Sequence, residues 1–269
     1  MTKSEASPTH SYPEPQTNSE TDLHPDLHDP EGDEGVLSPT VGWNVLHLFC
    51  KASASRPVVA GSALDAVDAA RKADLQVVTA SILGHKADFC VLALGPDLRE
   101  LRRLQTALQN AGLDVVDSYV SLTEVSEYAA GVPEEMKQAR LYPTLPPAGK
   151  LSFCFYPMSK RRSPGADNWY SLPYEERLRL MRGHGSVGRE FRGRVLQLVT
   201  GSTGVDDFEW GVTLFATHPD DLKDCVYTMR FDEASALYGE FGRFYSGFVA
   251  EPAEVFAEAG IGTRETRHE

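Results

Sequence analysis

The sequence predicts an α+β fold of two tandem ferredoxin-like halves, each ordered β-α-β-β-α-β, forming a domain pair of the dimeric α+β barrel type. The main observation is that one order of strand-like and helix-like segments occurs twice. The halves also share a visible repeat, because DFCVLALGPDLRELRR resembles EWGVTLFATHPDDLKD. The composition, with 41% hydrophobic and 24% charged residues, is that of a globular chain with a real core.

The first half begins after Gly42 with a run rich in branched and aromatic residues, which indicates a strand. A helix follows, for which Ser62 is the expected N-cap. In the second helix leucines recur at helical spacing, and Gly112 ends it as a C-cap residue would. The predicted strands cover 43–50, 75–83, 88–95 and 113–128, and the predicted helices cover 62–73 and 96–112.

The second half repeats this order. Pro173 stands near the first turn of its first helix, where proline is well tolerated. The last helical stretch contains a break or a bend. We expect the helices to cover one face of the sheet and to leave the other face for a ligand. The predicted strands cover 151–158, 193–201, 208–217 and 243–250, and the helical stretches cover 173–191 and 220–242.

Composition also sets the expected domain boundaries. Residues 1–40 are rich in Asp, Glu, Pro and Ser and cannot bury enough apolar surface to fold, so we expect a disordered acidic tail. The N-terminal half is expected at 41–135 and the C-terminal half at 151–252. A linker at 136–150 ends in the proline-rich PTLPPAG, and a second tail is expected at 253–269.

Charge and cysteine usage exclude several classes of protein. The net charge of -13 argues against nucleic acid as a partner. No run approaches the ~20 apolar residues of a membrane span, and the N-terminus lacks a signal-peptide pattern. The four cysteines form no CxxC pair and lie mostly in strand-like runs. This pattern favours reduced, structural thiols and a cytoplasmic location.

A histidine lies on an apolar helical stripe of the second half. His184 shares its face with Leu180, Val187 and Phe191. It therefore points either into the core or toward a ligand, and spacing alone leaves both possibilities open. The glycine on each side of it weakens the helix without a packing benefit, which is easier to understand if a flat group approaches closely.

A tyrosine and three cations follow one another at the start of the second half. Tyr156 closes an apolar strand and is either a packed lid residue or a phenol used in redox chemistry or proton transfer. Lys160, Arg161 and Arg162 form the densest cationic cluster of this acidic chain. They are either a binding site for carboxylates or phosphates or an exposed basic loop.

Several segments resemble the chlorite dismutase-like superfamily and, in detail, its coproheme decarboxylase branch. They cover most of 41–250 and include YPMSKRR, ADNWY, HGSVGREFRGRVLQLVTGSTG, DDFEWGVTLFA and VYTMRFDEASALYGEFG. The resemblance implies that iron-coproporphyrin III (coproheme) is the substrate and acts as its own cofactor. Hydrogen peroxide would oxidise two propionates to vinyls through a tyrosyl radical and a monovinyl intermediate, giving haem b and CO2. It also implies a homopentamer and a transient contact with the coproporphyrin ferrochelatase.

The same resemblance assigns roles to individual residues. His184 would be the proximal ligand of the haem iron. Tyr156 would carry the radical, and Lys160 would position the second propionate or deliver a proton near it. Trp169 and Trp210 match aromatic positions nearby, and Tyr128 in SEYAAG matches a tyrosine near a propionate. The implied cofactor-binding residues are Arg140, Tyr156, Pro157, Met158, Ser159, Lys160, Gln197 over the distal face, and Ser235.

Departures from the family pattern define the alternatives. Some members carry a distal histidine in the loop that reads RLYP here, so Tyr142 stands where that base would be. Chlorite dismutases carry a distal arginine where this chain has Gln197, which argues against chlorite chemistry. A haem or coproheme carrier without turnover is another alternative, although it gives no role to Tyr156 beside Lys160. A chlorite dismutase or peroxidase of the same fold is the remaining one.

Overall fold

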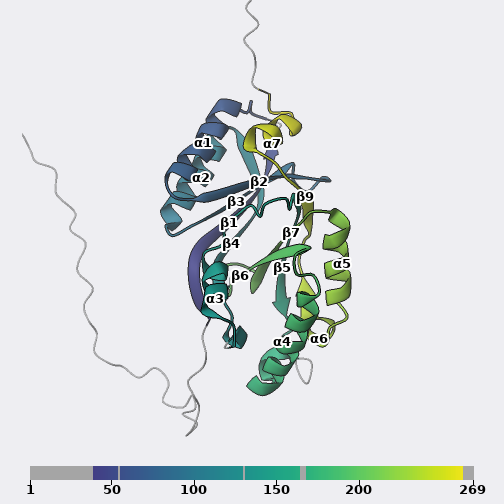
Figure 1. Ribbon diagram of the computed structural model, residues 1–269. Helices are drawn as coiled ribbons and strands as arrows, with labels where there is room; N and C mark the ends of the chain where they lie inside the picture. Colours follow the sequence, from purple (N-terminus) through teal and green to yellow (C-terminus); the bar gives the residue numbers. More distant parts are fainter. Residues whose placement is uncertain (1–38, 54, 130, 164–167, 263–269) are drawn as a thin grey trace, which may run out of the picture. The chain divides into compact units, whose positions relative to one another are not determined.

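The computed structural model describes residues 39–53, 55–129, 131–163 and 168–262 (Figure 1). Most of the predicted acidic tail, and residues 263–269 of the predicted C-terminal tail, lie outside the described residues. The elements are β1 (Thr40–Ala52), α1 (Ala60–Lys72), β2 (Gln76–Ile82), β3 (Phe89–Gly95), α2 (Leu98–Asn110), β4 (Leu113–Val125), η1 (Glu127–Ala129), α3 (Glu134–Leu141), β5 (Ser152–Lys160), η2 (Trp169–Ser171), α4 (Tyr174–Arg189), β6 (Val195–Gly201), β7 (Trp210–Ala216), α5 (Pro219–Met229), α6 (Glu233–Tyr238), β8 (Gly239–Phe241), β9 (Tyr245–Val249) and α7 (Pro252–Glu258).

The predicted α+β fold is confirmed, and the two halves have the same strand arrangement. The first half pairs its strands in the order β4-β1-β3-β2, and the second in the order β9-β5-β7-β6. Every pairing is antiparallel. The two segments that resemble each other in sequence form β3 with α2 in the first half and β7 with α5 in the second. The repeat in the sequence is therefore a repeat in structure.

The halves are joined at both edges of their sheets. β4 pairs with β6 and β2 pairs with β9, so the strand pairings run in a closed circuit, with β8 added to the end of β5. Gly247 makes one junction possible, because a Cβ there would lie 1.7 Å from the carbonyl oxygen of Ser81. A closed circuit leaves few unpaired backbone groups at strand edges.

Buried side chains fill the space on both sides of the strands. Large aromatic residues from both halves, among them Phe49, Phe153, Phe155 and Phe215, form the cluster enclosed by the circuit. A second cluster lies between the first-half strands and their helices, and a third lies between β5, β7 and α5. Each strand thus buries apolar residues on its inner face, as the alternating sequence predicts.

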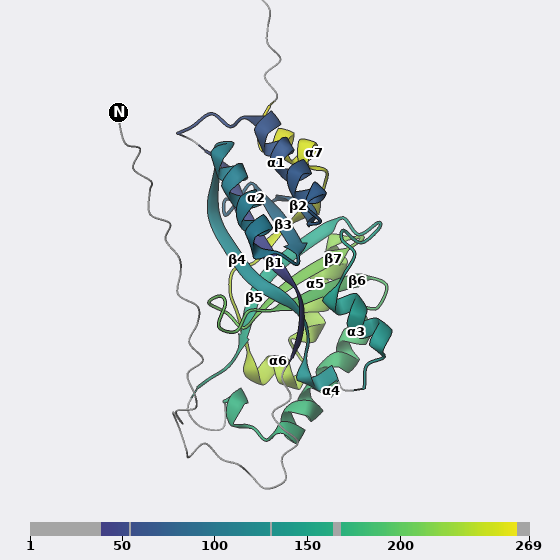
Figure 2. The same cartoon turned by 90° about the vertical axis from the view of Figure 1, so that its left-hand side faces the viewer.

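Helices gather on the two halves separately. Figure 1 shows α1, α2 and α7 beside the strands of the first half, and α4, α5 and α6 beside those of the second. Figure 2 shows the long strands β1 and β4 running from beside α2 toward α3. Strand β4 therefore reaches from the first half to the second. Within 39–262, leaving aside the undescribed positions, no helix has the length and apolar character needed to cross a bilayer.

Three boundaries differ from the sequence predictions. The prediction of Ser62 as an N-cap is wrong, because α1 begins two residues earlier, after Val59, without a side-chain cap. α3 occupies the start of the predicted linker. α7 occupies the start of the predicted C-terminal tail, and its Val255 and Phe256 are buried in the core of the first half. The chain thus returns after its second repeat to complete the first.

We expect α7 to be part of the folded core rather than a dispensable end. Phe256 is 1% exposed and contacts Phe89 edge-on, at 5.3 Å between ring centroids. Phe256→Ala should lower the free energy of unfolding by about 3–5 kcal/mol, since it removes a buried ring and leaves a cavity. Phe231→Ala, at a position 66% exposed, is the matched control and should change it by less than about 0.5 kcal/mol. Equal decreases in the free energy of unfolding for both variants, measured by urea denaturation, would contradict the assignment of α7 to the core.

Candidate functional site

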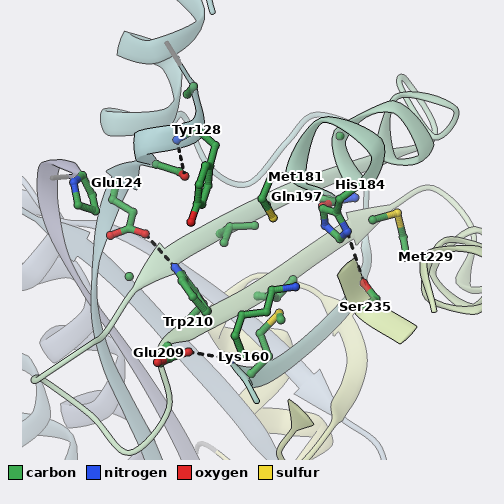
Figure 3. A pocket seen from close by; sticks show the side chains of 18 of the residues that line it. Glu124, Tyr128, Lys160, Met181, His184, Gln197, Glu209, Trp210, Met229 and Ser235 are labelled. Carbon is green, nitrogen blue, oxygen red and sulfur yellow. Dashed lines mark hydrogen bonds between the residues drawn. The ribbon is translucent and has the colours of Figure 1, made fainter. Parts of the chain in front are cut away.

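The second half carries a cavity of about 1250 Å³ (Figure 3). This exceeds the ~300–1,000 Å³ of ordinary small-molecule sites, so it suits a large ligand. Its walls come from β5, β6 and β7 on one side and from α4, α5 and α6 on the other. The prediction that the helices leave the opposite face of the sheet for the ligand is therefore wrong, because the cavity lies between strands and helices. The end of β4 with the turn after it, and Arg140 of α3, also contribute to the lining.

Side-chain alternation along β5 decides which predicted residues reach the cavity. Tyr156, Met158 and Lys160 line it, whereas Pro157 and Ser159 do not, because successive side chains of a strand point to opposite faces. The Ser159 hydroxyl instead accepts a hydrogen bond from the backbone N–H of Glu209 (3.2 Å). The structure therefore does not bring the Pro157 and Ser159 side chains to the site with the others.

His184 lines the cavity from α4, and its ring is fixed by a carboxylate. Its Nδ1 lies 2.9 Å from Oδ2 of Asp232, whose side chain is 4% exposed. Burial raises the pKa of Asp232, but hydrogen bonds from His184, Ser235 and the Ala234 N–H outweigh burial and leave this pKa below its usual value. An ionised carboxylate only accepts hydrogen bonds, so Nδ1 carries the proton of this hydrogen bond, which leaves Nε2 as the ring nitrogen that would bind a metal.

Sequence reasoning missed Asp232. This residue caps α6 by accepting the backbone N–H of Ala234 (3.0 Å) with its other carboxylate oxygen. In the sequence it reads only as the start of a helix, so its role toward His184 has no local signal. Ser235, which was predicted, lines the cavity, and its hydroxyl lies 3.4 Å from Nδ1 of His184.

Lys160 is a buried cation, not part of an exposed basic loop. Its residue exposure is 5%, its Nζ donates to the carbonyl oxygen of Ala234 (2.9 Å), and Nζ lies 4.8 Å from the centre of the Trp169 ring. Burial lowers the pKa of this ammonium to about 8, and the negative charges of Asp232 and Glu209 counteract part of that shift. The lysine therefore gives up its proton more readily than a surface lysine does.

The other two cations of the cluster are already paired. Arg161 pairs with Glu240 (3.6 Å), and Arg162 pairs with the buried carboxylate of Glu209. Glu209 also accepts the backbone N–H of Lys160 (2.8 Å). Of the predicted cluster, Lys160 and Arg162 line the cavity, and the chain itself supplies carboxylates for Arg161 and Arg162.

Tyr156 is 8% exposed and packs in a small aromatic cluster. Its ring stacks on Phe244 at 4.4 Å and meets Phe241 edge-on at 5.7 Å. Burial raises the pKa of its phenol, and the nearby thiols of Cys154 and Cys225 add to the rise. The phenol is therefore protonated at neutral pH and faces the same cavity as Lys160.

The remaining predicted residues divide between the lining and the surface. Tyr142 is 46% exposed and packs edge-on against Trp43 (5.4 Å), and it is not part of the lining. Gln197 is in the lining, and its Nε2 lies 3.5 Å from the buried thiol of Cys225. The structure therefore does not place Tyr142 as a base inside the cavity. The other predicted residues in the lining are Tyr128, Arg140, Trp169 and Trp210.

A second carboxylate that sequence reasoning missed faces the cavity from the first half. Glu124 of β4 accepts a hydrogen bond from Nε1 of Trp210 (3.0 Å), and burial raises the pKa of Glu124. Gly201 gives this carboxylate room, because a Cβ there would lie 1.9 Å from its Oε2. The pairing of β4 with β6 thus delivers an acidic group of one half into the cavity of the other.

The cavity combines apolar walls with cations that the chain does not neutralise. Arg140, Arg182 and Arg189 line it without an ion pair to any residue between 39 and 262 that the structure describes. All three are exposed, and unpaired cations at the rim of a cavity favour ligands with carboxylates or phosphates. The apolar part of the lining includes Met158, Met181, Val212, Leu214, Val226, Met229 and Phe244.

These features suit a porphyrin that carries iron and carboxylates. Histidine ligands of metals donate their second ring nitrogen to a carboxylate or carbonyl, as His184 does to Asp232, and histidine is a common axial ligand of haem iron. The apolar walls fit the macrocycle and the free arginines fit its carboxylates. His184, with Asp232 behind it, is thus the residue that would hold the iron.

Comparison with known proteins identifies the family. The family described as Chlorite dismutase matches residues 56–250. The chain belongs to the chlorite dismutase family. A haem-binding protein from Thermus thermophilus has a solved structure that is 36% identical, with a TM-score of 0.73, covering 83% of this chain and 97% of that one. A chlorite dismutase variant from Candidatus Nitrospira defluvii shares the fold at 17% identity, with a TM-score of 0.65, over 82% of this chain and 96% of that one.

A longer relative matches more closely in sequence. A candidate haem-binding protein of Natronomonas pharaonis is 47% identical over 208 residues, which is 70% of this chain. The match covers 34% of the relative, so the chain spans about a third of that protein.

We expect Lys160 to make the stability of the protein depend on pH. With a folded-state pKa of about 8 and an unfolded value of about 10.5, the unfolded chain binds more protons than the folded chain between these values. The free energy of unfolding therefore rises as pH increases through this window. Urea denaturation at several pH values should show this rise in the wild type and its loss in Lys160→Met, relative to the exposed control Lys223→Met. Parallel profiles for all three proteins would contradict the burial of the charge.

Proposed function

We propose that the protein is a coproheme decarboxylase. It uses hydrogen peroxide to convert two propionates of iron-coproporphyrin III into vinyl groups, releasing CO2 and producing haem b through a monovinyl intermediate. The observation that carries this proposal is the joint placement in one cavity of a carboxylate-backed histidine, His184, and of a buried phenol and a buried ammonium, Tyr156 and Lys160. A site that only stored a porphyrin would need the first of these and not the other two.

The chain's residues first bind and orient the substrate. His184 holds the iron through Nε2, and Asp232 fixes the tautomer and the ring orientation. The apolar walls exclude water from the macrocycle. The four carboxylates of coproporphyrin take up the free cations of the lining, each through charge-assisted hydrogen bonds of roughly 1.5–3 kcal/mol. Without such partners a tetra-anion would not leave water.

The overall reaction balances without any further redox partner. Each propionate, with one hydrogen peroxide and one proton, gives one vinyl group, one CO2 and two water molecules. The bound iron porphyrin supplies the oxidising equivalents by reacting with peroxide. Two rounds convert the substrate into haem b.

Tyr156 is proposed to transfer oxidising equivalents from the iron porphyrin to the propionate. Because its burial keeps the phenol protonated, it loses its proton together with the electron. The phenoxyl oxygen then takes a hydrogen atom from the propionate's β-carbon, which restores the phenol. Loss of CO2 then leaves the vinyl group, and the remaining electron would return to the bound iron porphyrin that peroxide had oxidised.

Lys160 is proposed to position the second propionate or to supply a proton near it. Tyr156, Met158 and Lys160 lie on the same face of β5, so the phenol and the ammonium both line the cavity. The lowered pKa of Lys160, about 8, keeps it mostly protonated at neutral pH while making the proton easier to donate. Each round consumes one proton, and Lys160 would donate it.

The proposal extends to the protein's surroundings. As in the branch that the sequence resembles, we propose a cytoplasmic homopentamer that takes coproheme from a coproporphyrin ferrochelatase through a transient contact. The second candidate function is a haem or coproheme carrier, because the names of the Thermus and Natronomonas relatives refer only to haem binding. A carrier would not need the buried Lys160 and Tyr156 in the lining of its cavity.

We predict that Tyr156→Phe binds iron-coproporphyrin III but forms haem b at least about a hundredfold more slowly, because the variant lacks the O–H that the reaction uses. The measurement is porphyrin mass and CO2 release during a peroxide titration. The wild type should show two successive mass losses. Tyr245→Phe, which also removes a buried hydroxyl but lies outside the cavity lining, should keep wild-type activity.

The outcomes separate the candidates. Tight binding with only bleaching in the wild type would indicate a carrier. Haem b formation by Tyr156→Phe at an unchanged rate would refute the role of the phenol while leaving the overall reaction in place.

A further inference from the structure

Glu209 brings a buried carboxylate close to Lys160, and the reaction proposed above gives this carboxylate no role. The residue is 5% exposed and lies immediately before β7, in the lining of the cavity. Burial of a carboxylate is costly unless the group is hydrogen-bonded and paired. The partners of Glu209 therefore indicate what its charge does in the folded protein.

One partner of Glu209 is the backbone of Lys160. Strand β5 pairs with β7 as far as Met158, which lies opposite Trp210, and the Glu209 N–H donates to the Met158 carbonyl oxygen (3.1 Å). Beyond this point Oε2 of Glu209 accepts the backbone N–H of Lys160 (2.8 Å). The other edge of β5 pairs Lys160 with Gly239 of β8. The backbone at Lys160 is therefore held on both edges of the strand, on one of them by a side-chain carboxylate.

The second partner of Glu209 is a cation on its other carboxylate oxygen. Nη2 of Arg162 donates to Oε1 of Glu209. The Arg162 side chain is 64% exposed, and its guanidinium lies 4.6 Å from the centre of the Tyr170 ring. A guanidinium beside a carboxylate offsets part of the negative charge that more distant groups experience. Arg162 therefore weakens the attraction between Glu209 and the Lys160 ammonium.

The ammonium of Lys160 lies among groups from several elements. Its Nζ donates to the Ala234 carbonyl oxygen of α6 (2.9 Å) and lies over the Trp169 ring of η2. Burial lowers its pKa to about 8, whereas the charges of Asp232 and Glu209 raise it. Figure 3 shows Glu209 and Lys160 side by side at the base of the cavity. The other titratable side chains in this part of the lining are Tyr156, Arg162, Tyr170 and His184.

We propose that Glu209 is a positioning residue for Lys160, because its carboxylate holds the strand from which the lysine extends and its negative charge keeps the buried ammonium protonated. Arg162, on the other oxygen of the same carboxylate, determines how strongly that charge acts. A buried lysine without a counter-charge tends to release its proton and become a neutral amine. The use of this proton in the cavity rests on the proposed function.

The test is a pH titration of Lys160 in the full-length protein without porphyrin, followed by NMR of lysine labelled with 13C at Cε. The loss of one signal in Lys160→Met assigns the resonance. Glu209→Gln keeps a carbonyl oxygen as the acceptor for the Lys160 N–H but removes the charge, so the pKa of Lys160 should fall by about one pH unit. Arg162→Gln removes the opposing cation, so this pKa should rise by about half a pH unit.

The opposite directions of the two shifts distinguish an electrostatic role from a structural one. A variant that only loosened the site would admit water and raise the pKa of Lys160 toward its ordinary value. The control Glu240→Gln removes an exposed carboxylate that pairs with Arg161 and should move this pKa by less than about 0.2. A rise or no change in Glu209→Gln would overturn the proposal, and so would a fall in Arg162→Gln. Thermal unfolding establishes that each variant is folded, and if Glu209→Gln is not, the direction of the shift in Arg162→Gln decides.

The titration also separates this role from the proposed reaction. If Glu209→Gln lowers the pKa of Lys160 but the wild type forms no haem b from iron-coproporphyrin III and peroxide, the role of Glu209 stands and the reaction is wrong. If haem b forms and neither variant moves the pKa, the reaction stands and the role of Glu209 is wrong. If both are right, haem b formation by Glu209→Gln should decline with rising pH about one pH unit earlier than in the wild type, because Lys160 loses its proton earlier.

Discussion

The alternation of side chains along β5 is the constraint on which the rest of the structure depends. This strand pairs with β7 along most of its length, with β9 at its start and with β8 at its end, so its register is fixed on both edges. Phe153 and Phe155 therefore fill the enclosed core, while Tyr156 and Lys160 face the cavity. A slip of one residue would exchange the two faces and would put a buried charge into the aromatic core.

A second constraint comes from the other wall of the cavity. α4 carries His184, and the cap of α6 supplies the carboxylate that orients it, so the packing of two helices determines the direction of one lone pair. Between these walls the cavity contains cations that the described residues do not pair and a buried arginine donor without a partner. Several positive charges of the lining therefore have no counter-charge among the described residues. A ligand with several carboxylates should stabilise the folded state by mass action as it binds.

Much of the fold could be predicted from the sequence, because alternating strands, leucine spacing and the internal repeat are local patterns. The exceptions have physical reasons. α7 is a short helix whose stability comes from burial of Val255 and Phe256 against the first half, a long-range contact without a local signal. Lys160 stands in a run of cations that is typical of a surface, and only the register of β5 shows that it is buried. Pro157 and Ser159 were predicted as part of a motif, which ignores the alternation that separates them from their neighbours.

The central claim is that His184 holds the iron of a porphyrin while Tyr156 and Lys160 face its carboxylates. The most direct measurement is a crystal structure of the protein with iron-coproporphyrin III bound under anaerobic conditions. This account predicts the iron on Nε2 of His184, the Asp232 hydrogen bond retained on Nδ1, a propionate beside the Tyr156 hydroxyl and a propionate within hydrogen-bond reach of the Lys160 ammonium. Iron held by any other residue, or a macrocycle whose edge at Tyr156 carries no propionate, would contradict it.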